Sequence, residues 1–104
     1  MYFDEDRLVR EIKRLSETIA RAVGLKNAEA QEEAEAGLGE LHRSIFGLDV
    51  GSTRRLHPSS LAAMVSPQHR AAAVAVLRAD ADLLEARGET GLAALRRSQA
   101  DSLA

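Results

Sequence analysis

Three histidines are the residues of this chain best suited to bind a metal, but their spacing does not favour a metal site. His42, His57 and His69 fall in separate segments, and the chain has no cysteine that could complete a zinc-binding set. Structural zinc sites use closely spaced pairs of such ligands. We therefore expect solvent-facing or helix-capping histidines and no metal ion.

Two other groupings could in principle support catalysis. His57 lies next to Ser59 and Ser60, which suggests a base and a nucleophile, but neighbouring residues rarely reach that geometry and no strand–turn–helix elbow surrounds them. Asp80 and Glu85 could exchange protons, yet no pattern predicts an apolar pocket that would raise a pKa. We expect no catalytic residue, no cofactor and no enzymatic activity.

Two adjacent arginines, Arg54 and Arg55, follow Gly51, Ser52 and Thr53 in a polar segment. They could receive an anion, but the segment lacks the glycine pattern and lysine of a phosphate loop, so a solvated loop is the better prediction. The aromatic residues Tyr2 and Phe3 stand before the first expected helix. The candidate contacts for a partner are Tyr2, Phe3, Arg54 and Arg55.

The composition indicates one small domain, residues 1–104, with a thin core. Of the 104 residues 45% are hydrophobic, but three are aromatic and nineteen are alanine, so little apolar area is buried per residue. A net charge of −2 argues against a general nucleic-acid binder. No apolar run approaches the ~20 residues that cross a bilayer, and the N-terminus lacks a secretory signal. We expect a cytoplasmic protein that binds neither nucleic acid nor membrane.

Apolar residues at helical spacing predict an N-terminal hairpin over residues 4–47. The first helix carries an apolar stripe along one face and ends at Gly24. The second helix runs from after Asn27 to about Phe46. Gly37 and Gly39 are costly inside a helix and indicate either a close helix approach, which we favour, or a bend. Gly47 should end the helix, with Leu48 packing back on its last turn. The two apolar stripes are Leu8, Ile12, Leu15, Ile19 and Val23, then Ala30, Ala34, Leu38, Leu41, Ile45 and Leu48.

A connecting segment, residues 48–65, should follow. Residues 47–58 have no helical period and are rich in turn residues, which predicts a loop. Residues 59–65 then predict a short helix with Leu61, Met64 and Val65 pointing inward.

A second hairpin is predicted over residues 66–104. Ser66 and Pro67 are typical of a helix start, and Gly88 of a helix end. The apolar faces are Val74, Leu77, Ala81 and Leu84, then Leu92, Ala93, Leu95, Ala100 and Leu103. Arg78, Asp80, Asp82 and Glu85 should lie largely outside them.

The small residues of this hairpin resemble a tetratricopeptide-type repeat. Ala81, Gly88, Ala93 and Ala100 have the relative spacing of its small positions. Asp80, Leu84 and Arg97 depart from the pattern, where leucine, tyrosine and an aromatic residue are usual. An ordinary αα-hairpin is the alternative.

Most of the chain also resembles an uncharacterised bacterial family of short all-helical proteins. Such proteins join an amphipathic N-terminal helix to a second helix with a G-L-D-like end and a tetratricopeptide-like hairpin. No activity is established for that family, so the resemblance implies a fold and no mechanism. It is carried by residues 6–25, Glu32-Glu33-Ala34, Phe46-Gly47-Leu48-Asp49 and residues 84–100.

The sequence thus predicts an all-α bundle of two αα-hairpins joined by a loop and a short helix. The thin core favours a protein–protein interaction or scaffold module that associates with itself, with a dimer as the first expectation. The alternative is a small regulatory or antitoxin-like subunit that binds an acidic partner through residues 51–58. An enzyme or ligand-binding bundle has no positive residue evidence.

Overall fold

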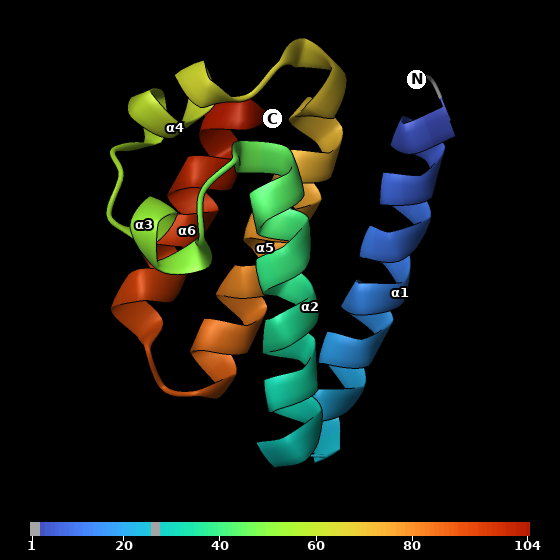
Figure 1. Ribbon diagram of the computed structural model, residues 1–104. Coiled ribbons are helices and arrows are strands. Elements are labelled where there is room, and N and C mark those ends of the chain that lie inside the picture. Colours follow the sequence, from blue (N-terminus) through green and yellow to red (C-terminus); the bar gives the residue numbers. More distant parts are fainter. Residues whose placement is uncertain (1–2, 26–27) are drawn as a thin grey trace.

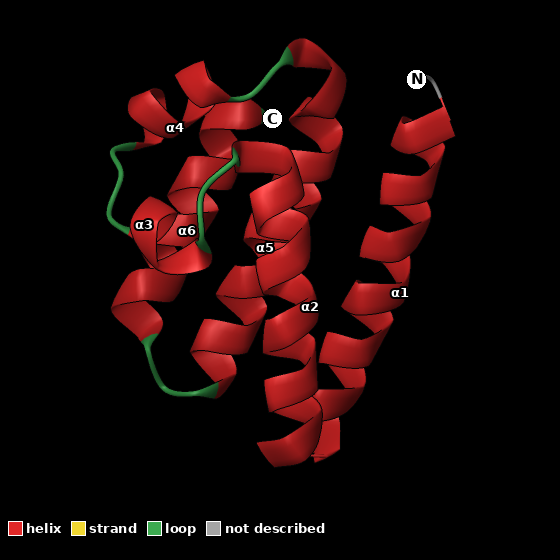
Figure 2. Cartoon of the chain, viewed as in Figure 1, coloured by secondary structure: helices red, strands yellow, loops and turns green. Residues whose placement is uncertain are grey.

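The chain folds as an all-helical bundle in the computed structural model (Figures 1 and 2). The structure describes the backbone of residues 3–25 and 28–104, and it leaves the side chains of residues 3–6, 8–9, 22–25, 28 and 30 outside its description. No strand occurs in this described part. The helices are α1 (Phe3–Leu25), α2 (Ala28–Phe46), α3 (Val50–Arg54), α4 (Pro58–Met64), a 3-10 turn (Pro67–His69), α5 (Arg70–Ala86) and α6 (Thr90–Leu103).

The N-terminal hairpin packs α1 against α2 as predicted. Ile12, Leu15 and Ile19 are buried on α1, while the side chains of Leu8 and Val23 lie outside the described residues. The two glycines of α2 differ. A Cβ atom on Gly37 would lie 3.1 Å from Cδ1 of Leu15, whereas a Cβ on Gly39 would meet nothing within 4 Å. The predicted close approach is therefore present at Gly37 and absent at Gly39.

Within the C-terminal hairpin, α5 is the central helix of the molecule, because it packs against α6 and also contacts α1 and α2. Ala81, Ala93 and Ala100 are completely buried, because small side chains let the two helices lie close together. Gly88 ends α5 with φ +81°, and the N–H of Glu89 donates to the Leu84 carbonyl at 2.9 Å. With the Gly88 N–H donating to the Glu85 carbonyl, this is a Schellman end.

The connecting segment contains one more helix than predicted. Residues 47–58 were expected to be a loop, but α3 forms inside them because Asp49 caps it and accepts from the Ser52 N–H at 2.7 Å. The short helix α4 is confirmed, with Leu61 and Val65 buried. Met64 is 41% exposed, so its predicted inward position is wrong.

The end of α2 also differs from the prediction. Gly47 has the expected positive φ of 74°, but its N–H donates to the Arg43 carbonyl in a single bond of the simpler αL type. Leu48 is 38% exposed rather than packed back on α2, because the chain turns away there toward the Asp49 cap of α3.

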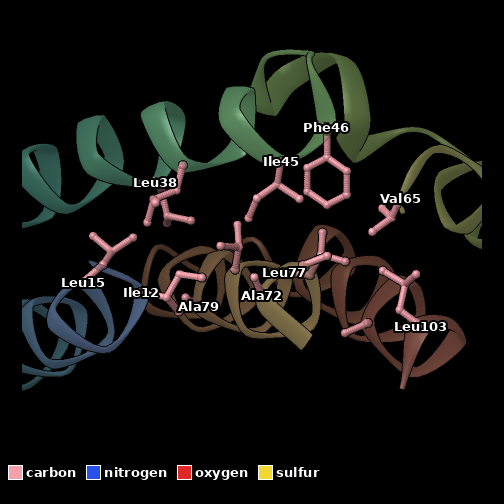
Figure 3. Close-up of a cluster of buried hydrophobic side chains, with 14 of the residues drawn as sticks. Ile12, Leu15, Leu38, Ile45, Phe46, Val65, Ala72, Leu77, Ala79 and Leu103 are labelled. Atoms are coloured by element: carbon pink, nitrogen blue, oxygen red, sulfur yellow. The ribbon is translucent and has the colours of Figure 1, made fainter. Parts of the chain in front are cut away.

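One apolar core joins the two hairpins. In Figure 3, Leu38, Ile45 and Phe46 of α2 face Leu77 and neighbouring residues of α5, with Leu15 entering from α1 and Val65 and Leu103 closing the other end. In the described part of the chain no helix is both long and apolar enough to cross a membrane. The apolar core holds α2 and α5 together, with α1 on one side of them and α3 and α6 on the other (Figure 1).

Candidate functional site

A buried carboxylate, Asp80 on α5, lies between two arginines. Nη2 of Arg54 donates to its Oδ1 at 2.8 Å and Nε of Arg54 to its Oδ2 at 3.2 Å. Nε of Arg96 donates to the same Oδ2 at 2.6 Å. The side chains of Asp80 and Arg96 are 1% and 0% exposed, and that of Arg54 is 20% exposed. This ion triad links α3, α5 and α6 inside the bundle.

The other two nitrogens of Arg96 also donate within the same cluster. Nη1 donates to Oε1 of Gln99 at 2.8 Å, and Nη2 donates to the Val50 carbonyl and to Oγ1 of Thr53. Gln99 turns its amide nitrogen to the carbonyls of Thr53 and Leu56, each at 2.9 Å. Two residues one turn apart on α6 thus satisfy the backbone of α3 and of the loop after it, which explains how so short a helix is held.

The charges of the triad set its protonation states. Burial by itself raises the pKa of Asp80, but the hydrogen bond from Arg54 and the charge of Arg96 outweigh it, and the net pKa is lowered. Burial lowers the pKa of Arg96, and the charge of Asp80 offsets part of this lowering. For Arg54 the pKa is raised, mainly because Arg54 donates a hydrogen bond to Asp80. Because a guanidinium keeps its proton, the triad carries one net positive charge.

His42 on α2 extends this cluster toward the apolar core. Its side chain is completely buried, its ring lies 4.4 Å from that of Phe46 between centroids, and Nε2 contacts Oγ1 of Thr53. Oγ1 of Thr53 already accepts from Arg96 and lies 3.1 Å from the Val50 carbonyl, so we assign Nε2 of His42 as the donor. Nδ1 then holds a lone pair that has no hydrogen-bond partner.

The imidazole of His42 is kept neutral by its surroundings. Burial and then the charge of Arg96 lower its pKa from 6.5 to about 4; Arg54 adds to the lowering, and Asp80 and Asp49 oppose it. Neither His42 nor Thr53 has any exposed surface. A substrate cannot reach this histidine–hydroxyl pair, so the arrangement fixes helices and does not present a reactive group.

This cluster corrects two sequence predictions. Asp80 is buried rather than outside the apolar face, and His42 is buried rather than solvated. Arg54, a candidate partner contact, is bonded to Asp80. A signal did exist in the spacing. Asp80 follows Leu77 by three residues and precedes Leu84 by four, which is the buried phase of α5.

Of the other predicted residues, the structure describes the side chains of Arg55, His57 and His69 but not those of Tyr2 and Phe3. Tyr2 lies outside the described residues, and Phe3 begins α1 but its side chain is not among those described. Arg55 is exposed at the end of α3. His57 caps α4, as its Nδ1 accepts from the Ser59 N–H at 3.2 Å, which confirms the expected capping role. His69 pairs with Oγ of Ser66 at 3.1 Å.

An open groove of about 570 Å³ runs between α1 and α5, on a face that the sequence did not single out. Ile19 and Ala79, which are nearly inaccessible, form part of its lining, and Ala20, Ala75 and Ala86 are more exposed. The residues that line it are Ser16, Ile19 and Ala20 of α1 and Ala75, Arg78, Ala79, Asp82, Glu85 and Ala86 of α5. In the described part of the chain its lining is mainly apolar with small side chains, and the charged side chains that line it belong to α5.

Comparison of the chain with protein-family models, with curated proteins and with solved structures gave no match. The resemblance to a bacterial helical family and the tetratricopeptide-like character of α5 and α6 both stay predictions.

Proposed function

We propose that this chain is a non-enzymatic protein-interaction module and that the groove between α1 and α5 is its contact surface. The observation that carries the proposal is the contrast between two regions. The buried polar side chains form one hydrogen-bonded cluster that is closed to solvent, whereas a groove lined by alanines remains open; the buried polar residues are His42, Thr53, Asp80, Arg96 and Gln99. Exposed apolar hollows rimmed by charge are typical of binding surfaces.

The form of the groove favours a helix as the occupant. It lies between the helices α1 and α5. Its alanines allow a third helix to approach closely, since the distance between helix axes falls toward about 8 Å when the contacting side chains are small. An extended peptide would leave backbone groups unpaired against such a wall, because α1 and α5 use their own backbone groups within the helices.

The alternative surface, residues 51–58, presents fewer free positive charges to an acidic partner than the sequence predicts. Arg54 is already bonded to Asp80 through two nitrogens, so only Arg55 of the two arginines is free to turn outward. The groove is therefore the stronger candidate.

Photocrosslinking tests the proposal. A benzophenone amino acid replaces Ala86, which lines the groove, or in a matched control Ala63, an exposed alanine of α4. In cells that express the chain, we expect a discrete covalent protein adduct at Ala86 and none at Ala63. Equal labelling at both positions, or no adduct at Ala86, would contradict the proposal.

A further inference from the structure

The charges along the groove wall are arranged so that they complement a second copy of the same helix. Arg78 and Asp82 lie one turn apart on the outer side of α5, and their side chains are 57% and 64% exposed. A turn of helix separates them by about 6 Å along the axis. Both residues line the groove, with Ala75 before them and Ala86 after them.

We propose that the occupant of the groove is a second copy of this chain, which binds with its α5 antiparallel to the first α5 about a two-fold axis. The inference rests on the groove being the contact surface. If the axis passes at the height of position 80, Arg78 of each copy faces Asp82 of the other, since the two residues lie equally far from that position. Such an interface uses the same patch on both copies and closes after two.

The same operation brings small and aliphatic groups of the groove together. Ala75 of each copy lies at the height of Glu85 of the other copy and meets its aliphatic stem. Each α5 lies in the groove of the other molecule, with α1 as the outer wall. A parallel arrangement would place Arg78 against Arg78 and Asp82 against Asp82, so the charge pattern selects the antiparallel one.

The ion pairs that Arg78 and Asp82 make within one molecule do not prevent them from pairing with a second copy. Arg78 reaches Asp101 only at 3.8 Å, and Asp82 accepts from Arg97 at 3.2 Å, both at the exposed surface. Exposed ion pairs contribute little stability and rearrange readily. Arg97 also bonds to Glu85, so it keeps an anionic partner when Asp82 turns to the second copy.

Swapping the charges at Arg78 and Asp82 in the purified 104-residue chain tests the inference. Sedimentation equilibrium from about 1 μM to about 1 mM brackets the affinity expected of a small interface. The wild type should dimerise reversibly. Arg78→Asp alone and Asp82→Arg alone should each weaken dimerisation at least about tenfold, because the symmetry creates two like-charge contacts in each. The double variant should recover to within about threefold of the wild type.

A mixture of the two single variants gives a sharper result. One molecule then has two acidic side chains at these positions and the other two basic ones, so every cross-contact between them is attractive. We expect the mixture to form heterodimers although neither variant dimerises well alone. Arg55→Asp, an exposed charge change immediately after α3, serves as the control and should leave dimerisation unchanged.

Failure of this inference differs from failure of the groove as a contact surface. A wild type that stays monomeric, or a dimer that the single changes do not weaken, or no recovery in the double variant or the mixture, would overturn the antiparallel pairing. The crosslinked adduct at Ala86 reports on the groove independently. An adduct of about twice the chain mass of 11.2 kDa supports a second copy, and an adduct with another protein would keep the groove as a contact surface and reject this occupant.

Discussion

Arg96 of α6 donates from Nε to Oδ2 of Asp80 on α5 at 2.6 Å, and both side chains are almost completely buried. The pair joins the two helices of the C-terminal hairpin, α5 and α6. Through Arg54, Thr53 and Gln99 it also anchors α3. Removing ions from water is costly unless each finds partners, and here nearly every donor of Arg96 has one. The polar cluster thus specifies how the connecting segment lies on α5 and α6.

Asp80→Asn should destabilise the protein by about 3–5 kcal/mol. The change keeps the shape but removes the one negative charge between the guanidinium groups of Arg54 and Arg96, and it puts an amide NH₂ group against their N–H groups. Urea unfolding measures the effect. Asp82→Asn is the matched control, because Asp82 is 64% exposed, and should change stability by no more than about 0.5 kcal/mol. Equal losses from the two variants would contradict the role assigned to Asp80.

His42 should make stability depend on pH between about 6.5 and about 4. Its pKa is lowered in the folded state, so the unfolded chain binds more protons in this range, and stability is full above the range and falls as pH falls. From pH 7 to pH 5 the loss should be about 2 kcal/mol. Asp80, whose folded pKa is lowered, loses its contribution only at more acidic pH.

The variant His42→Leu isolates this contribution. Leucine keeps the apolar contact with Phe46 and cannot titrate, while Oγ1 of Thr53 keeps Arg96 as its donor. We expect the urea midpoint of the variant to be nearly flat from pH 7 to pH 5, where that of the wild type declines. Parallel profiles for the two proteins would show that His42 is not the titrating group.

The apolar framework could be read from the sequence because helical periodicity reports on burial directly. Ile12, Leu15 and Ile19, and likewise Ala34, Leu38 and Leu41, occupy the faces that their spacing predicted. Gly47 and Gly88 end helices as predicted, since the left-handed conformation is cheap for glycine alone.

The polar cluster could not be read in the same way. Arg96 and Gln99 have the spacing of buried positions on α6, but arginine and glutamine are usually exposed unless partners far along the chain satisfy them. Those partners lie 43 to 46 residues away on α3 and the loop after it. Because α3 is short, its only local signal is the Asp49 cap. Burial of Asp80 and formation of α3 depend on each other, which a local pattern does not reveal.

Arg54 and Arg55 should respond differently to truncation, although the sequence treats them as a pair. Arg54→Ala leaves Asp80 with Arg96 as its remaining cationic partner and should cost about 1–3 kcal/mol, limited by the partial exposure of Arg54. Arg55→Ala should stay within about 0.5 kcal/mol. Thermal unfolding at neutral pH compares them. Loss of stability from Arg55→Ala alone would mean that α3 packs differently from the arrangement described.

The close approach of α1 and α2 at Gly37 can be measured with Gly39 as its internal control. Gly39→Ala should stabilise the protein by about 0.5–1 kcal/mol, because alanine favours the helix and its Cβ meets open space. Gly37→Ala gains the same backbone preference but places a Cβ 3.1 Å from Cδ1 of Leu15, so it should be at least about 0.5 kcal/mol less favourable than Gly39→Ala. In a Leu15→Ala background, itself about 2–5 kcal/mol less stable, the two glycine substitutions should become equivalent. If Gly37→Ala matched Gly39→Ala with Leu15 in place, α1 would not approach α2 as closely as the structure shows.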